Sequence, residues 1–191
     1  MNTTEMTNPP CLPVTLQQAK SYLRVLDGED DATIIDMIAV ATRRAEVILN
    51  RPIIARQYRA EYDCFPAAFE LKKSPVLSVD SITYIDTDGA SQTLVSQNYR
   101  VDLGDRYRPA RISPATGITW PATASDYNTV KVDFTAGYGA DWTSVPAAVR
   151  HAVLMLTGHY YDERSIVTYG RAATTVPETA AALLAGEALP I

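Results

Sequence analysis

The chain has 191 residues, a formal net charge of −5, 47% hydrophobic residues and 20% charged residues. This composition is typical of a globular domain and excludes a disordered chain, and the acidic balance excludes a basic nucleic-acid binder. Cys11 and Cys64 lie far apart and outside any CxxC pattern, so we expect free thiols in a reducing compartment. There is no signal-peptide pattern and no apolar run of about 18 residues. We therefore expect a soluble protein made in the cytoplasm.

Helical patterns occupy the first part of the chain. Residues 1–14 are mostly polar and proline-rich, which predicts a flexible or extended arm. Thr15 and Gln18 then fit a capping box that opens an amphipathic helix near residues 15–25. After an acidic DGEDD segment, a longer helix is expected over 31–50. Its apolar stripe is predicted to contain Ile34, Ile35, Ile38, Ala41, Ala45, Ile48 and Leu49, with Asp36, Arg43, Arg44 and Glu46 facing away.

Short β-like runs separated by turns fill the middle of the chain. Asp88-Gly89 between two of these runs is a strong hairpin signal, and the spacing indicates antiparallel strands rather than βαβ units. The predicted strands are Ile54–Tyr62, Ala68–Leu71, Val79–Ile85, Ser91–Leu94, Tyr99–Asp102, Ala110–Ile112 and Val130–Thr135.

Helical periodicity returns after a Gly137-Tyr138-Gly139 turn. The next helix is predicted near 146–164, and a short Ala/Leu-rich helix near 178–188. The whole pattern predicts an α+β fold, in which a small helical bundle carries an inserted antiparallel β-rich module. The predicted parts are an arm at 1–14, a bundle at 15–50 and 144–164, an inserted module at 51–143, and a C-terminal arm with a short helix at 165–191.

Two loops invite a ligand-binding interpretation that fails on detail. The third glycine of a dinucleotide-binding G-x-G-x-x-G would fall at Trp142. Asp86-Thr87-Asp88-Gly89 begins like a calcium loop, but the fifth position is Ala90 and the twelfth is Gln97. A plain turn and a hairpin explain these loops better.

Catalytic and metal-binding patterns are also missing from the sequence. His151 and His159 are eight residues apart on one predicted helix, roughly 12 Å, which is too far to share a metal ion. There is no Gly-x-Ser-x-Gly elbow. We therefore predict no catalytic, cofactor-binding or metal-binding residues, and keep a small enzyme or ligand-binding module as the alternative class.

Tyrosine is the abundant aromatic residue, with 11 Tyr against 3 Phe and 2 Trp. Tyrosine combines a large apolar ring with a polar tip, which suits surfaces that become interfaces. The alternative is that the tyrosines only cover the sheet.

The order of several segments resembles the phage head–tail connector, or adaptor, family of long-tailed phages, prophages and gene transfer agents. The resemblance covers about residues 13–164. Its pieces are PVTLxxAKxxLRV at Pro13–Val25, DGEDD, the helix Ile34–Glu46 ending in NRP, the stretch Leu71–Gly89, YRVD, ITWP, VxFTAGYG, and VPAAVRHAVLxLxxHYYDxR.

The resemblance implies a structural role in a virion. Such adaptors assemble as a ring, expected to be a dodecamer, beneath the portal protein after DNA packaging, and so complete the head. They extend the DNA ejection channel, through which DNA passes without specific binding. They also provide the attachment surface for a downstream connector, stopper or tail protein. The localisation implied is the head–tail interface of a particle made in the bacterial host cytoplasm, and the alternative is another tail-completion or baseplate protein.

Two sets of interface residues follow as hypotheses. The ring interface is predicted to use Tyr138, Trp142, Tyr160, Tyr161 and Tyr169. The portal-binding surface is predicted to be one face of the last helix, with the alternative that this helix packs on its own domain; the face comprises Ala180, Leu183, Leu184 and Ala188.

Overall fold

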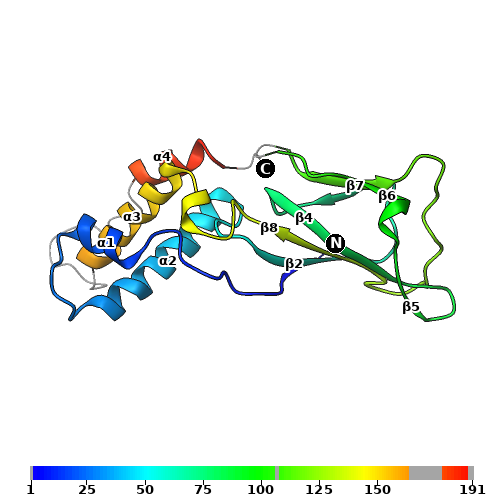
Figure 1. The fold of residues 1–191 in the computed structure, drawn as a ribbon, viewed down its shortest axis with the longest axis horizontal. Coiled ribbons are helices and arrows are strands. Elements are labelled where there is room, and N and C mark those ends of the chain that lie inside the picture. The colour runs from blue at the N-terminus through cyan, green and yellow to red at the C-terminus, as the bar shows by residue number, and fades with distance from the viewer. Residues whose placement is uncertain (1, 106–107, 164–177, 189–191) are drawn as a thin grey trace. The chain divides into compact units, whose positions relative to one another are not determined.

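The computed structural model describes residues 2–105, 108–163 and 178–188 (Figure 1). Within these residues lie four α-helices and eight β-strands, and all strand pairs are antiparallel, so the predicted α+β class is confirmed. The chain divides into two compact units. The β unit comprises 1–9 and 55–137, and the helical unit comprises 10–54 and 138–191.

Helix α1 (Leu16–Leu23) opens the helical unit with the predicted capping box. The backbone N–H of Gln18 donates to Thr15 Oγ1 at 3.2 Å, and the N–H of Thr15 donates to Gln18 Oε1 at 2.9 Å. Two donors that the first helical turn leaves without intrahelical partners are thereby satisfied. The helix ends at Arg24, which adopts a left-handed conformation with φ of 60°.

Helix α2 (Asp31–Leu49) buries a stripe that differs from the predicted one, most clearly at Ile35 and Glu46. Ile35 is 42% exposed, because at 100° per residue it lies at the edge of the stripe centred on Ile38 and Ala45. Glu46, predicted to face solvent, is only 7% exposed. Its Oε1 accepts a hydrogen bond from the N–H of Ile53 at 2.9 Å, so this carboxylate satisfies a backbone donor in the turn after the helix.

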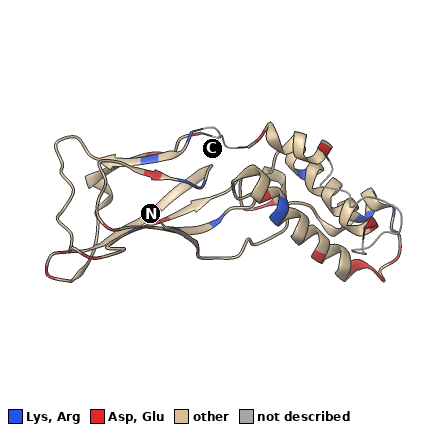
Figure 2. Ribbon diagram, turned by 180° about the vertical axis from the view of Figure 1, so that it is seen from behind, with Lys and Arg blue, Asp and Glu red and all other residues tan. Residues whose placement is uncertain are grey.

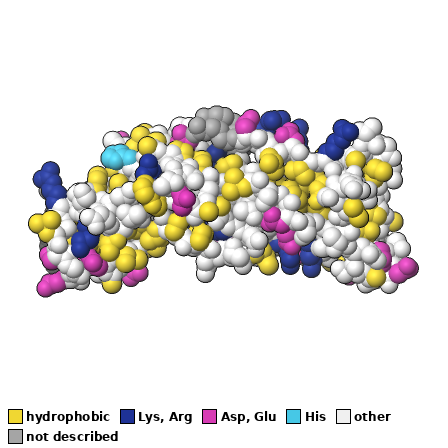
Figure 3. Space-filling view, viewed as in Figure 1, with side chains coloured by type: hydrophobic (Ala, Val, Ile, Leu, Met, Phe, Trp, Pro, Cys, Tyr) yellow, Lys and Arg dark blue, Asp and Glu magenta, His cyan; other side chains and the backbone are white. Residues whose placement is uncertain are grey.

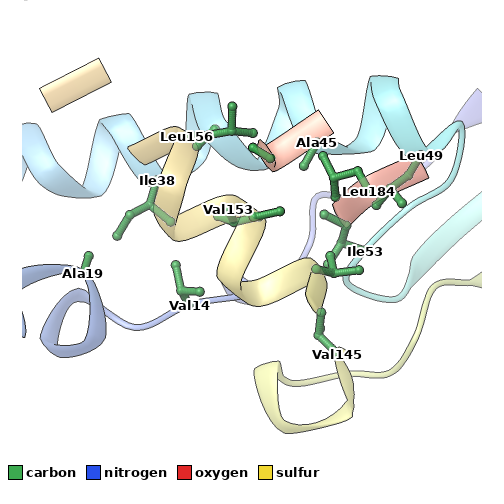
Figure 4. Packing of buried hydrophobic residues seen from close by; sticks show 14 of the residues in the cluster. Val14, Ala19, Ile38, Ala45, Leu49, Ile53, Val145, Val153, Leu156 and Leu184 are labelled. Carbon is green, nitrogen blue, oxygen red and sulfur yellow. The ribbon is translucent and has the colours of Figure 1, made fainter. Parts of the chain in front are cut away.

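Helices α3 (Ala147–Asp162) and α4 (Glu178–Ala185) complete the core of the helical unit. Figure 4 shows α2 and α3 running antiparallel, with side chains from both helices between them. Leu184 of α4 lies close to Leu49 and Ile53. This core consists of small and aliphatic residues: Val14, Ala19, Ile34, Ile38, Ala41, Ala45, Leu49, Ile53, Ile54, Val145, Val149, Ala152, Val153, Leu156, Ala180 and Leu184.

The β unit contains two sheets with a common core. The five-stranded sheet has the order β1 (Asn2–Glu5), β2 (Arg56–Tyr62), β8 (Val130–Ala136), β4 (Val76–Ile85) and β5 (Ser91–Thr93). The three-stranded sheet has the order β3 (Phe69–Leu71), β7 (Ala110–Pro114) and β6 (Tyr99–Asp102). Strand β8 is the centre of the larger sheet, and its residues alternate between buried and half-buried, as its period-two pattern predicts.

Strand β1 forms within the predicted N-terminal arm and was not predicted as a strand. Residues 2–5 pair with β2, in register from Asn2 opposite Glu61 to Glu5 opposite Tyr58. The Arg56 guanidinium anchors the strand by an ion pair with Glu5, with 3.2 Å between Nε and Oε1. The segment is polar because most of β1 is exposed and its pairing uses the main chain. A hydrophobic pattern is therefore not needed to form it.

Aromatic rings fill one part of the β core. Phe69 is fully buried, and its ring centroid lies 4.8 Å from that of Tyr62, 5.9 Å from that of Phe65 and 5.5 Å from that of Trp120. Phe65 and Trp120 stack at 4.9 Å. Edge-to-face and offset-stacked pairs of this kind add to the free energy of burial.

The turn between β4 and β5 confirms the predicted hairpin. Gly89 adopts a positive φ of 82°. The Asp86 carboxylate accepts from the N–H of Asp88 at 3.0 Å, from the N–H of Ala90 at 2.9 Å and from Gln92 Nε2 at 2.9 Å. These hydrogen bonds, that from Gln92 above all, hold the pKa of Asp86 below its ordinary value. The carboxylate is therefore a structural part of the turn.

Candidate protein interaction surfaces

The Gly137-Tyr138-Gly139 turn lies where the chain passes from the β unit into the helical unit. Gly137 adopts a positive φ of 142°, in agreement with the predicted turn. Gly139 is needed for another reason, since a Cβ built there would lie 2.4 Å from Ser144 Cβ. The turn therefore packs tightly on the short 3-10 helix η2 (Trp142–Ser144).

Trp142 is half-buried at the start of η2. Asp141 caps this turn, accepting from the N–H of Thr143 at 2.8 Å, and these contacts with Thr143 lower the pKa of the carboxyl. The Arg150 guanidinium carbon lies 5.2 Å from the centroid of the Trp142 ring. This cation–π contact fixes one face of the ring on its own domain.

Three predicted interface tyrosines are half-buried and pack against the core of the helical unit: Tyr138, Tyr160 and Tyr161. The hydroxyl of Tyr161 donates to Asp30 Oδ2 at 2.5 Å, which ties the end of α3 to the start of α2. Tyr169 lies outside the described residues. The rings of the three tyrosines thus stabilise the helical unit, and their role in a ring interface stays a prediction.

Helix α4 packs on α2 and α3. Ala180 and Leu184, two residues of the predicted portal-binding face, are fully buried in the core of the helical unit. Leu183 is 36% exposed and Ala188 is half-buried. Leu183 and Ala188 are thus the residues of this set that a partner can reach, while Ala180 and Leu184 pack on their own domain.

A groove runs between α1 and α3 on the surface of the helical unit. Its volume is about 670 Å³, and its walls include Gln17, Ser21 and Tyr22 of α1 and Arg150, His151 and Leu154 of α3. On the other side of Tyr22, which lines both, lies a second hollow of about 370 Å³ beside Met155, His159 and Asp162. The Tyr22 ring meets His151 edge-on at 6.1 Å between centroids. We call the two hollows together the α1–α3 groove.

The outward face of α2 carries exposed aliphatic side chains. Val40 is 55% exposed and Val47 is 62% exposed, and at 100° per residue both project directly away from the buried stripe. Asp36, Arg43 and Arg44 lie on the same face. We call these five residues the α2 ridge. Sequence reasoning identified its charged members and missed the two valines, although the seven-residue spacing of Val40 and Val47 opposite the apolar stripe was visible.

Titratable groups with shifted pKa values serve structural contacts. Arg59 holds the pKa of Asp133 below its ordinary value, and burial raises the pKa of Tyr62 to about 12. Figure 2 shows charged residues of both signs in both units, with acidic residues in the loop that leads into α2. Within the described part of the chain, no group of three His, Cys, Asp or Glu residues could hold a metal ion, and no helix is long and apolar enough to cross a bilayer.

Among known proteins, solved structures share the fold of this chain. No protein-family model and no curated protein matches the chain. Solved structures do match. A chain in the structure described as "Virion of native gene transfer agent (GTA) particle" superposes with a TM-score of 0.80 at 25% identity, covering 100% of this chain and 97% of that one.

Two further matches come from particle necks, and both cover 100% of this chain and 97% of the other. One is described as "Neck of empty GTA particle computed with C6 symmetry", with a TM-score of 0.79 and 24% identity. The other is described as "Neck of native GTA particle computed with C12 symmetry", with a TM-score of 0.77 and 24% identity. Over its full length, the chain therefore shares the fold of chains found in gene transfer agent particles.

Proposed function

We propose that this chain is a structural protein of the neck of a virion or gene transfer agent particle. The observation that carries the proposal is the likeness over the full length of both chains, at TM-scores of 0.77–0.80, to chains in GTA neck and virion structures. A match that leaves almost no part of either chain unpaired involves both units, the β unit and the helical unit. It therefore supports a shared role more strongly than a match of one common module does.

Within the neck, the proposed role is that of the head–tail connector, or adaptor. The chain forms a ring of twelve copies beneath the portal protein, extends the DNA channel and docks the next connector or tail component. The C12 and C6 symmetries in the descriptions of the matched necks support a ring. The net charge of −5 suits a conduit through which DNA slides, because like charge disfavours attachment of phosphates.

The proposal is tested with the purified full-length chain and DNA-filled particles that carry a portal but lack this protein. Electron microscopy is expected to show a ring of the chain at the portal vertex, with twelve-fold symmetry. A chain that binds isolated tails but not the portal vertex is instead a tail-completion or baseplate protein. A chain that stays monomeric and binds neither structure overturns the proposal and favours the alternative of a ligand-binding module.

The contribution of α4 to portal binding is best tested by a point substitution. A deletion of residues 172–191 would also remove Ala180 and Leu184 from the core, so a loss of binding would have two causes. Leu183→Asp changes an exposed side chain of α4 and leaves the core intact. We expect Leu183→Asp to weaken portal binding, and Thr179→Asp, also at an exposed position on α4, to leave it unchanged. Equal binding by both variants excludes α4 from the portal contact.

A further inference from the structure

We infer that the α2 ridge of one copy seats in the α1–α3 groove of the next copy, so that these two surfaces form the contact between neighbours in the ring. The inference rests on the proposed function, since it concerns the interface of the proposed ring. It names a different pair of surfaces from the aromatic residues that the sequence suggests.

The α2 ridge places two exposed valines among arginines on the outward face of a long helix. Val40 and Val47 are 55% and 62% exposed, although valine is a weaker helix former than the residues common on helix surfaces. Arg43 and Arg44 lie between the two valines, one turn from each. Arginine is enriched at protein interfaces, and the two valines add apolar surface beside it. Figure 3 shows hydrophobic side chains among charged ones on the surface of the helical unit.

The ridge and the groove lie on different sides of the helical unit. Helices α2 and α3 pack on each other through their buried stripes, which include Ile38 on α2 and Val153 on α3. The ridge lies on the side of α2 opposite its stripe. The groove residues of α3, such as His151 and Leu154, lie on the side of α3 away from α2. One rigid unit thus presents a convex strip on one side and a concave groove on the other.

Rotational symmetry requires such a pair of different surfaces. In a closed ring every copy uses one patch to contact a second, non-identical patch on its neighbour. The structures that share this fold include necks with C12 and C6 symmetry, so a second copy of the chain is the occupant that the fold supports. A two-fold contact of ridge with ridge would use one patch twice and would leave the groove empty.

The symmetry also sets the direction in which the ridge meets the groove. A twelve-fold rotation turns every helix by at most about 30°, so the α2 of a neighbour stays nearly parallel to the α2 of the first copy. Because α2 and α3 are antiparallel within one copy, the ridge lies antiparallel to the α3 that it contacts (Figure 4). Helix-in-groove packing of this kind is a common mode of recognition.

This direction sets which side chains meet. Asp36 falls at the His159 end of the groove, where His159 Nε2 already lies 3.7 Å from Glu163 Oε2 and Asp162 adds a second carboxylate, so Asp36 gains no new ion pair there. Val40 then falls beside Tyr22 and Met155. Val47 lies eleven residues beyond Asp36, about 16 Å at 1.5 Å per residue, which reaches the Leu154 and Ala147 end.

The arginines of the ridge face mostly uncharged groups in this arrangement. Arg44 falls beside the exposed Gln17 and Ser21 of α1, whose oxygens can accept hydrogen bonds. Arg43 keeps its ion pair with Glu46 at 3.3 Å. Arg150, the basic residue on the α3 wall, is engaged with the ring of Trp142. The contact therefore places the valines beside Tyr22, Met155 and Leu154, in walls that also contain polar side chains.

The direct test is cross-linking of Val40→Cys with Ser21→Cys in a full-length chain whose native cysteines are replaced by Cys11→Ala and Cys64→Ser. The chain is added to DNA-filled particles that lack it and treated with a short bis-maleimide. We expect the double variant to give a ladder of covalent multimers, while each single variant stays monomeric. Val40→Cys combined with Ala90→Cys, at the exposed β4–β5 turn, is the matched pair expected to give no ladder.

The outcomes separate this inference from the proposed function. A ring seen at the portal vertex by electron microscopy without a ladder overturns the interface and leaves the adaptor role intact. Covalent dimers from Val40→Cys alone show a ridge-to-ridge contact and also overturn it. If the wild-type chain does not join the particles at all, the proposed function fails and the inference fails with it.

A second variant tests the energetics of the same contact. Val40→Glu places a carboxylate at the centre of the ridge, one turn from Arg43 and Arg44. Binding would remove its hydration, a cost that an ion pair with these arginines offsets only in part. We expect the amount of chain incorporated into particles to fall at least about tenfold, with the circular dichroism spectrum unchanged because Val40 is exposed. Val95→Glu is the control, since Val95 in the β unit is 56% exposed against 55% for Val40. Equal incorporation of both variants contradicts the inference.

Discussion

The two units of this chain solve the problem of core packing with different residues. All three phenylalanines lie in the β unit, at positions 65, 69 and 134, and the core there is built from stacked and edge-on rings. The core of the helical unit contains no buried aromatic side chain among the described residues, and alanine, valine, isoleucine and leucine fill it.

The size of the core side chains differs between the units, and so does the position of their exposed hydrophobic residues. Small side chains such as Ala41, Ala45 and Ala152 let α2 and α3 approach closely, which leaves the larger Val40 and Val47 on the outside of the bundle. In the β unit the rings of Phe65, Phe69 and Trp120 pack in or against the core, and exposed side chains such as Val95 and Tyr127 lie on separate segments. The helical unit is the one in which two exposed valines lie along one face of a single helix.

Removing the central aromatic ring of the β core is expected to lower the free energy of unfolding more than any other substitution proposed below. Phe69→Ala takes away a fully buried ring that contacts three other aromatic rings, so the free energy of unfolding should fall by about 3–5 kcal/mol. Each unit has one tryptophan, Trp120 in the β unit and Trp142 in the helical unit. In a Trp142→Phe background, Trp120 fluorescence reports on the β unit, and the urea midpoint should fall when Phe69→Ala is introduced. In a Trp120→Phe background, Trp142 fluorescence reports on the helical unit, and the urea midpoint should fall less.

An aliphatic deletion in the helical core should cost somewhat less. Leu156→Ala leaves a cavity among small side chains and should lower the free energy of unfolding by about 2–5 kcal/mol. For this variant the urea midpoint followed by Trp142 fluorescence should fall more than the midpoint followed by Trp120 fluorescence. Val47→Ala removes an exposed side chain and is the matched control, with a change within about 0.5 kcal/mol. An equal effect of both variants would show that Val47 is buried in the isolated chain.

Much of this architecture could be predicted from local patterns. Strand β6 has the predicted bounds, because its ends are marked by turn residues, and β8 differs by one residue. Strand β1 was missed because the sequence NTTE has no alternation of apolar and polar residues. Its place depends on pairing with β2 and on the ion pair of Glu5 with Arg56, contacts about 50 residues away in the chain.

The candidate surfaces were harder to predict, for a related reason. An apolar face on α4 is visible in the sequence, but what covers it is not, and Ala180 and Leu184 are buried on their own domain. Glu46 was assigned to solvent because a carboxylate usually faces water, whereas here the N–H of Ile53 requires a buried acceptor. Both cases depend on contacts between segments, which periodicity does not encode.

Loss of the α1 capping box should have a moderate effect confined to the helical unit. Thr15→Ala removes the acceptor for the N–H of Gln18, and the free energy of unfolding should fall by about 1 kcal/mol. Gln17→Ala, at an exposed position in the same helix, is the control and should change stability by at most about 0.5 kcal/mol. The Trp142 signal is the one to follow. A shift confined to Trp120 would show that the cap influences the β unit instead.

The smallest predicted effect depends on pH and belongs to the β unit. Across β2 and β8, the Arg59 guanidinium donates to both carboxylate oxygens of Asp133, at 2.7 and 2.8 Å. This contact lowers the pKa of Asp133 below its ordinary value. The carboxylate form is thus favoured in the folded state, and its contribution is fully present above the unfolded pKa of about 3.9. The contribution is lost as pH falls through the lower, folded pKa.

Asp133→Asn should therefore lower the free energy of unfolding by about 0.5–1 kcal/mol at neutral pH, because the pair is partly exposed. The difference between variant and wild type should shrink as the pH falls below about 3.9. Asp88→Asn, at an exposed turn position, should follow the wild type throughout. A difference from wild type that stays constant down to the acid limit would show that Asp133 acts through packing or neutral hydrogen bonds. The ion pair across β2 and β8 would then contribute no pH-dependent stability to the β unit.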